Sequence, residues 1–186
     1  MNRKPTRRCD ESGATLIEVL ISTVVLGVGL MGAAQTMGTA VSSVLISQEQ
    51  LIAKQKAREA LESVFTARNT QNVVWNDVRN TSAGGIFLSG FQDLRETGTD
   101  GIANTADDAA AALAAITLPG PDGNLGTGDD VVRVLDSFER RIAVSDVLLP
   151  NDEVDPDIRK VEVEVRYQFR GLSRTVRLST LISRFS

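Results

Sequence analysis

Histidine is absent from this 186-residue chain, and cysteine occurs once, at Cys9. Without histidine, the sequence cannot build a Ser-His-Asp triad, a Cys-His pair or the usual zinc centres. If residues 1–13 are removed, no cysteine remains, which also excludes a disulfide, a thiol nucleophile and a thiolate metal site. The commonest enzyme classes are therefore excluded, and we expect a protein that is not an enzyme.

The chain also has no excess of positive charge. The formal net charge is -4 at neutral pH, which argues against nucleic acid as the main partner. Residues 1–13 are the exception, because they hold four basic and two acidic side chains, and their removal changes the net charge from -4 to -6. At this length we expect one modest domain and an anchor.

A long apolar run, Ala14 to Met37, follows the basic segment. As a helix these 24 residues would be about 36 Å long, which exceeds the roughly 30 Å of a bilayer core. Basic residues precede the run and none lies within it, which predicts that residues 1–13 face the cytoplasm and the remainder lies outside. We therefore expect residues 14–37 to span a membrane.

Gly13 stands in front of the apolar run. In an ordinary secretory signal the small-residue cleavage site follows the apolar core, so the core is discarded. A cut between Gly13 and Ala14 would instead keep the apolar helix in the mature protein, with Glu18 as its fifth residue. This arrangement resembles the class III signal of type IV pilins and their pseudopilin relatives.

The resemblance implies a processing route and a set of partners. A prepilin peptidase would cut after Gly13 and methylate the new amine of Ala14, which makes residues 1–13 a cytoplasmic leader peptide. The mature chain would sit in membrane lipid of the bacterial inner membrane. It would then join other pilin or pseudopilin subunits through an inner-membrane assembly platform. Most members of the family have phenylalanine at the new N-terminus, where this chain has alanine.

Glu18 is the only charged side chain in the apolar run. An ionised carboxylate in a bilayer costs about 2.5–3.5 kcal/mol on insertion scales. One interpretation is a tolerated charge near the helix end, from where the carboxylate partly reaches the interface. The other, which the resemblance implies, is that Glu18 pairs with the α-amine of Ala14 in a neighbouring subunit and sets the axial register.

Two stretches of the run, Leu16 to Leu20 and Val25 to Ala34, are most similar to the PilV-type minor pilins, with the GspI-like minor pseudopilins of type II secretion second. The implied function is a minor pilin, a structural subunit of a type IV pilus with a role in assembly, at the tip or in modification. One alternative is a GspI-like pseudopilin. Another, from a different class, is a membrane-anchored calcium-dependent binding protein that does not polymerise.

Behind the apolar run the pattern becomes amphipathic, with apolar residues at three- and four-residue steps from Val41 to Phe65. We predict one helix over residues 14–68. The poor helix formers of residues 69–72 would end it. Its first half would meet lipid or other helices, and its second half would pack one stripe on a globular domain.

The C-terminal third has strand patterns. Residues 161–169 alternate apolar and polar side chains, residues 175–183 form the return strand, and residues 131–135 and 141–147 predict one or two earlier strands. The resulting antiparallel sheet of three or four strands has an apolar face that needs a cover, which the amphipathic half of the helix supplies. Periodicity thus predicts an α+β, pilin-like fold, with residues 69–186 as a periplasmic or extracellular globular domain.

Residues 96–130 are acidic, and no Lys or Arg occurs between Arg95 and Arg133. Within this loop Asp100–Asp108 repeats as Asp122–Asp130, with Asp, Gly, Thr, Asp and Asp coinciding at a shift of 22 residues. Calcium is bound by carboxylate, amide and carbonyl oxygens on flexible turns. The candidate calcium ligands are Asp100, Asn104, Asp107, Asp108, Asp122, Asn124, Asp129 and Asp130.

Two interpretations of these repeats stay open. The spacing is not that of an EF-hand, whose loop needs a glutamate at its twelfth position. It looks similar to short aspartate-rich calcium loops of extracellular bacterial proteins, and the alternative is a solvated acidic loop. Between the repeats, the alanine-rich residues 109–116 predict a short helix.

The C-terminal end carries many arginines. One interpretation is a solvated sheet face on which Glu162 and Glu164 balance the arginines. The other is an electrostatic contact with an acidic loop of a neighbouring subunit. The arginines are Arg140, Arg141, Arg159, Arg166, Arg170, Arg174, Arg177 and Arg184.

Overall fold

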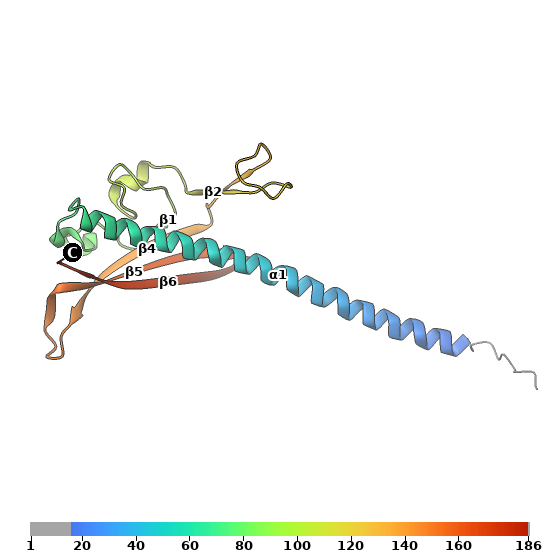
Figure 1. Cartoon of the computed structure of the whole chain (residues 1–186). Helices are drawn as coiled ribbons and strands as arrows, with labels where there is room; N and C mark the ends of the chain where they lie inside the picture. Colours follow the sequence, from blue (N-terminus) through green and yellow to red (C-terminus); the bar gives the residue numbers. More distant parts are fainter. Residues whose placement is uncertain (1–15, 186) are drawn as a thin grey trace, which may run out of the picture. The chain divides into compact units, whose positions relative to one another are not determined.

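A computed structural model of the chain describes residues 16–185 (Figure 1). It begins with one helix of 54 residues, α1, Leu16–Asn69. The chain divides into two compact units, Met1–Leu45 and Ile46–Ser186, and α1 starts in the first and ends in the second. The leader, with the cleavage residues Gly13 and Ala14, lies outside the described residues.

In the first unit the surface of α1 is apolar. Its leucine, isoleucine, valine and methionine side chains are exposed. The hydroxyl of Thr23 donates to the carbonyl of Leu20 at 2.9 Å, and that of Thr36 to the carbonyl of Ala33 at 2.8 Å. Because these hydroxyls are satisfied by the helix itself, they add little polarity to its surface. By length and composition, α1 is able to cross a membrane.

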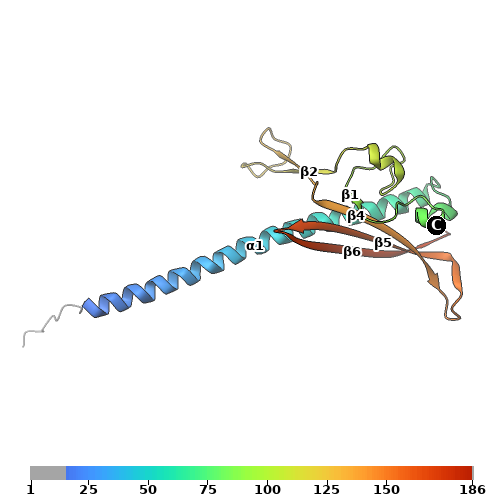
Figure 2. The same cartoon turned by 180° about the vertical axis from the view of Figure 1, so that it is seen from behind.

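In the second unit one face of α1 is buried. It carries mostly alanine at three- and four-residue steps, which places these side chains on one side of the helix. Figure 1 and, from behind, Figure 2 show this half of α1 lying along the sheet. The buried residues are Ala53, Ala57, Ala60, Val64 and Ala67.

The sheet under α1 has four antiparallel strands in the order β1-β4-β5-β6. They are β1 (Gln92–Asp93), β4 (Phe138–Leu148), β5 (Val154–Phe169) and β6 (Leu172–Ser183). Alternate residues of β5 point into the core and are fully buried. This confirms the predicted α+β arrangement of one long helix on an antiparallel sheet. The core residues of β5 include Val161, Val163 and Val165.

The other face of the sheet carries paired charges. Arg141 on β4 donates to Glu164 on β5 at 2.6 Å, and Arg177 on β6 reaches the same carboxylate. Arg166 donates to Glu139 at 2.7 Å. For these arginines the structure therefore supports the balanced sheet face rather than a surplus of positive charge.

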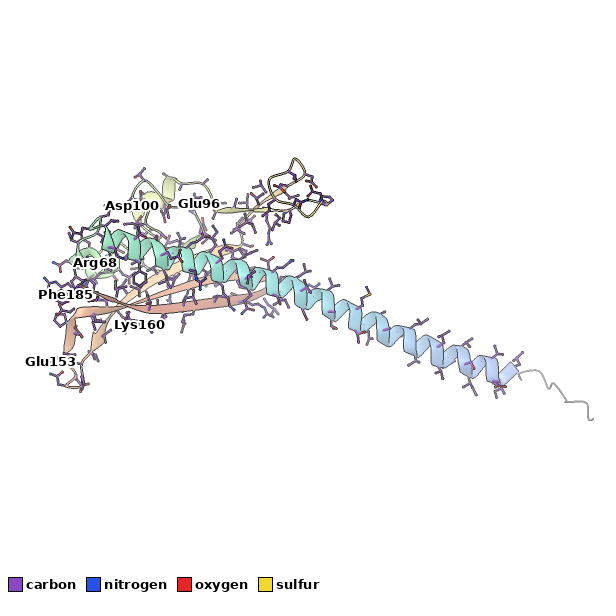
Figure 3. All side chains as sticks on the ribbon, viewed as in Figure 1. Arg68, Glu96, Asp100, Glu153, Lys160 and Phe185 are labelled. Carbon is purple, nitrogen blue, oxygen red and sulfur yellow. The ribbon has the colours of Figure 1, made fainter. Side chains whose placement is uncertain are left out.

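Irregular segments join the helix to the sheet, with 3-10 turns at Trp75–Asp77, Thr81–Ala83 and Ala106–Ala110. The side chain of Asn80 donates to the carbonyl of Ile142 at 2.7 Å and accepts from the amide of Val144 at 2.8 Å, so it holds this segment against β4. Arg68, near the end of α1, donates to the carbonyl of Arg184. Figure 3 accordingly shows Arg68 and Phe185 at the same end of the second unit.

Two further strands depart from the sequence-based expectation. Val131–Val134 (β3) does not join the main sheet but pairs with Ala115–Leu118 (β2) in a separate two-stranded sheet. The next strand along the chain, β4, already pairs with β1 and β5. The short helix expected over residues 109–116 is also wrong, because Ala106–Ala110 forms a 3-10 turn and residues 115 and 116 are already strand.

We predict that Leu135→Ala lowers the free energy of unfolding by about 2–5 kcal/mol, because Leu135 is fully buried and its truncation leaves a cavity. Leu172→Ala is the matched control. Leu172 is 62% exposed, so its truncation should change stability by less than about 0.5 kcal/mol. Denaturant unfolding of the full chain in detergent micelles, followed by the fluorescence of Trp75, measures both. Equal losses would contradict this description of the core.

Candidate functional site

The first candidate site is the beginning of α1. Glu18 lies in the first turn of the described helix, beside a shallow hollow of about 280 Å³ that Val19, Ser22, Thr23 and Leu26 also line. Within residues 16–185 the Glu18 carboxylate forms no ion pair. Its expected partner, the α-amine of Ala14, lies outside the described part of the chain. The pairing therefore stays a prediction.

The second candidate site is the acidic repeat. We call residues 98–108 the first loop and residues 120–130 the second loop. In the first loop the carboxylate of Asp107 accepts the amide of Asp100 at 3.0 Å. In the second, Asp129 accepts the amide of Asp122 at 3.3 Å. The two loops thus close through the same bond, at the same shift of 22 residues.

The next carboxylate in each loop also has the same role. Asp108 accepts the amide of Asn104, and Asp130 accepts the amide of Gly126, both at 2.6 Å. Asn104 has φ +67° and Gly126 has φ +87°, a left-handed conformation that asparagine and glycine tolerate better than other residues. The repeat seen in the sequence is therefore a repeat of backbone geometry.

Hydroxyl groups complete both frames and lower the pKa of one carboxyl group in each loop. Thr105 donates to Asp107 at 2.6 Å and Thr127 to Asp129 at 2.5 Å. With the Asp100 amide, the Thr105 hydroxyl lowers the pKa of Asp107 to about 2. The Thr127 hydroxyl lowers the pKa of Asp129 in the same way. Both carboxylates are consequently ionised at neutral pH.

A glycine that starts each loop was missed by the sequence reasoning. A Cβ atom at Gly98 would overlap the carboxyl group of Asp107, and a Cβ at Gly120 would overlap Asp129. The repeat extends back to these two glycines at the same shift of 22 residues, which is the signal that identifies them.

The two loops differ in their surroundings. Arg140 on β4 donates to Asp108 at 3.3 Å, and both side chains are buried. Burial raises the pKa of Asp108, although the amides of Gly98 and Asn104 oppose the shift, and burial lowers the pKa of Arg140. The first loop is therefore docked on the core of its own unit through a buried ion pair.

The second loop has no corresponding cation. Asp130 occupies the position of Asp108, and in the described part of the chain its Oδ1 atom is buried without a hydrogen-bond partner. Leu125 at its tip is 65% exposed, whereas Ala103, the corresponding residue of the first loop, is buried. The second loop is a copy of the first that lacks the contacts by which the first is docked.

No metal centre is assembled among residues 16–185, where no group of three or more acidic side chains is placed to hold an ion. Of the eight candidate calcium ligands, four carboxylates accept hydrogen bonds from their own loops: Asp107, Asp108, Asp129 and Asp130. Asp100 and Asp122 each accept the amide two residues further on. Asn104 and Asn124 donate their side-chain amides to the carbonyls of Leu88 and Asp122. Calcium binding stays a prediction.

Comparison with known proteins identifies one feature. Residues 8–34 match the prokaryotic N-terminal methylation motif. Neither a curated protein nor a solved structure matches the chain. The match ends within the apolar half of α1 and leaves the sheet and the acidic loops without a counterpart.

We predict that Asp108→Asn lowers the free energy of unfolding by about 3 kcal/mol, because it leaves the buried Arg140 cation without its counterion. Asp130→Asn is the matched control, with the same change at the same position of the second loop. With no buried cation beside it, we expect a loss below about 1 kcal/mol. Denaturant unfolding of the full chain measures both, and similar losses would contradict the difference in docking.

For calcium, we predict that isothermal titration of the full chain in detergent micelles gives a saturable heat. A variant with all four aspartates 107, 108, 129 and 130 replaced by asparagine should lack it, because the carboxylates supply the charge that calcium needs. An unchanged heat in this variant, or no heat in the unaltered chain, would refute calcium binding by the loops.

Proposed function

Because the chain carries a type IV pilin-like prepilin signal, we propose that it is a minor pilin, a structural subunit of a type IV pilus. The single observation that carries this proposal is the methylation motif over residues 8–34, which continues into a helix long and apolar enough to cross a membrane. A prepilin peptidase cuts between Gly13 and Ala14, and the new N-terminus is methylated.

The surface of α1 supports a role in assembly. From Leu16 to Met37 its apolar side chains are exposed, in places by more than 70%. Such a surface is stable only in lipid or against other apolar helices. The same surface thus serves the subunit twice, first as an anchor in the inner membrane with residues 1–13 in the cytoplasm, and then as the packing face inside a filament.

Glu18 makes the packing of α1 inside a filament specific. In a bundle of apolar helices its carboxylate needs a cation, because an unpaired buried charge costs several kcal/mol. The α-amine of Ala14 on a neighbouring subunit supplies that cation when the two chains are offset along the filament axis. The pair fixes this offset, and the helices supply most of the contact area.

The motif also suggests a structural subunit rather than an enzyme. The second unit would be presented in the periplasm or at the cell surface. Within the pilin class we favour a minor subunit, because residues 16–20 and 25–34 are most similar to the PilV-type minor pilins. The alternatives remain a GspI-like pseudopilin of type II secretion and an anchored calcium-dependent binding protein that does not polymerise.

We predict that Glu18→Ala lowers the incorporation of the chain into filaments at least about tenfold, since the loss of a buried charge pair exceeds 1.4 kcal/mol. Membrane insertion should be unchanged or improved, because a charge is removed from the apolar run. Immunoblots of sheared filaments and of membranes from the native host measure the two pools.

Glu62→Ala is the control for this prediction. Glu62 is an exposed glutamate of the same helix outside its apolar half, and its replacement should leave both pools at normal levels. Normal incorporation of the Glu18→Ala variant would exclude the polymer proposal and favour an anchored protein that does not polymerise.

A further inference from the structure

A cationic groove lies between α1 and β6 in the second unit. It has a volume of about 420 Å³ and is lined by Leu51, Lys54, Gln55 and Arg58 of α1 and by Leu178 of β6. We call it the α1–β6 groove. Leu51 is 69% exposed, so an apolar side chain is open to solvent in the same groove as the two cations. An acidic segment with one apolar side chain would complement this surface.

The two cations of the groove are unpaired within residues 16–185. Neighbouring basic residues are not: Lys56 contacts Glu59 at 2.8 Å and Arg133 contacts Glu49 at 2.7 Å. Among the described side chains no acidic group forms a salt bridge with Lys54 or Arg58. The groove therefore keeps two positive charges that no acidic side chain of residues 16–185 neutralises.

The second loop has the complementary chemistry. It carries Asp122, Asp129 and Asp130 and no basic residue. Leu125 stands exposed at its tip, and none of the three carboxylates forms an ion pair among the described residues. The loop thus offers negative charge around one leucine, where the groove offers positive charge around Leu51 and Leu178.

The first loop shows how this frame is docked. It has the same backbone hydrogen bonds, and it buries Ile102 and Ala103. Its second carboxylate, Asp108, accepts a hydrogen bond from the guanidinium of Arg140. The corresponding carboxylate of the second loop is Asp130. A guanidinium and an apolar contact are what the second loop lacks, and the groove contains both, in Arg58 and Leu51.

The second loop cannot reach the groove of its own chain. Arg133 of β3 holds the hairpin that carries the loop to Glu49 of α1, through two hydrogen bonds of 2.7 and 3.0 Å. At about 100° per residue, the groove residues of α1 lie about 140–240° around the helix from Glu49. In Figures 1 and 2, β2 lies on one side of this part of α1 and β6 on the other.

We propose that the second loop of one copy docks in the α1–β6 groove of a neighbouring copy, with Leu125 against Leu51 and the loop carboxylates against Lys54 and Arg58. Different surfaces of the two copies meet in this contact, so each copy keeps one free loop and one free groove. Such a head-to-tail contact extends into a helical filament unless it closes into a ring.

This inference rests on the proposed function, since it needs two adjacent copies in one filament; two are enough, which is compatible with a minor subunit. A loop tip is far smaller than the roughly 1,000 Å² of a stable interface. Packing of the apolar helices must therefore supply most of the affinity. Because that packing holds the loop near the groove at high effective concentration, a weak contact suffices to set the orientation of the second units.

The test is thiol cross-linking in filaments and membranes of the native host. The full chain receives Gln55→Cys and Leu125→Cys, with Cys9→Ser to remove its only native cysteine. A short bismaleimide in the presence of a chelator should give a cross-linked dimer, which extends to a ladder of longer oligomers where more than two copies are adjacent, because each copy carries both halves of the contact. Chains with only one of the two new cysteines should give no ladder.

The charges are tested by Lys54→Glu with Arg58→Glu. We expect the ladder to fall at least about tenfold, since two attractive pairs become repulsive. Arg174→Glu is the control, an exposed arginine of β6 outside the groove, and it should leave the ladder unchanged. An unchanged ladder in the variant with Lys54→Glu and Arg58→Glu would overturn the proposed docking.

The failures of the two proposals are distinguishable. If the cysteine chain enters filaments at normal levels but no bond forms between positions 55 and 125, the docking is refuted and the filament function stands. If the unaltered chain never enters filaments, the proposed function fails, and the docking between filament neighbours fails with it.

Discussion

The packing of one narrow face of α1 on the sheet is the contact on which the second unit depends. Ala53, Ala57 and Ala60 lie in one buried cluster with the core valines of β5, from which water is excluded. This contact determines which side of α1 is left for other partners. Leu51, Lys54 and Arg58 lie on that side, and they line a groove that the core does not use.

The acidic repeat shows one local structure in two tertiary settings. Bonds between aspartates and nearby amides close both loops, so each frame forms without help from the rest of the fold. In the first loop Asp108 then meets Arg140, and the loop becomes part of the core. In the second, Asp130 forms no ion pair with a cation among residues 16–185, and the frame stays at the surface. The same local structure is thus part of the core in the first loop and lies outside it in the second.

Sequence patterns predicted the elements that are determined by residues close together in the chain. Residues 161–169 and 175–183 were recognised as strands because alternation places every second side chain on the buried face. The pattern of residues 131–135 predicted a strand correctly but assigned it to the wrong sheet. Alternation identifies a strand without identifying the strand with which it pairs. The alanine-rich residues 109–116 were expected to be helical, but residues 115 and 116 pair with Arg133 and Val134 instead. Pairing across the chain overrides the helix propensity of alanine there.

The methylation motif over residues 8–34, the membrane-length helix and the duplicated loop follow from residues close together in the chain, because charge order, helical periodicity and turn chemistry act over a few residues. The ion pair of Asp108 and the different surroundings of Asp130 do not follow from such patterns, since both carboxylates occupy equivalent sequence positions. Arg140 is 32 residues from Asp108 in the sequence, and only the pairing of β4 in the sheet brings it to one loop and not to the other. The α1–β6 groove has the same origin, because Leu178 joins Lys54 and Arg58 only when the helix packs on the sheet.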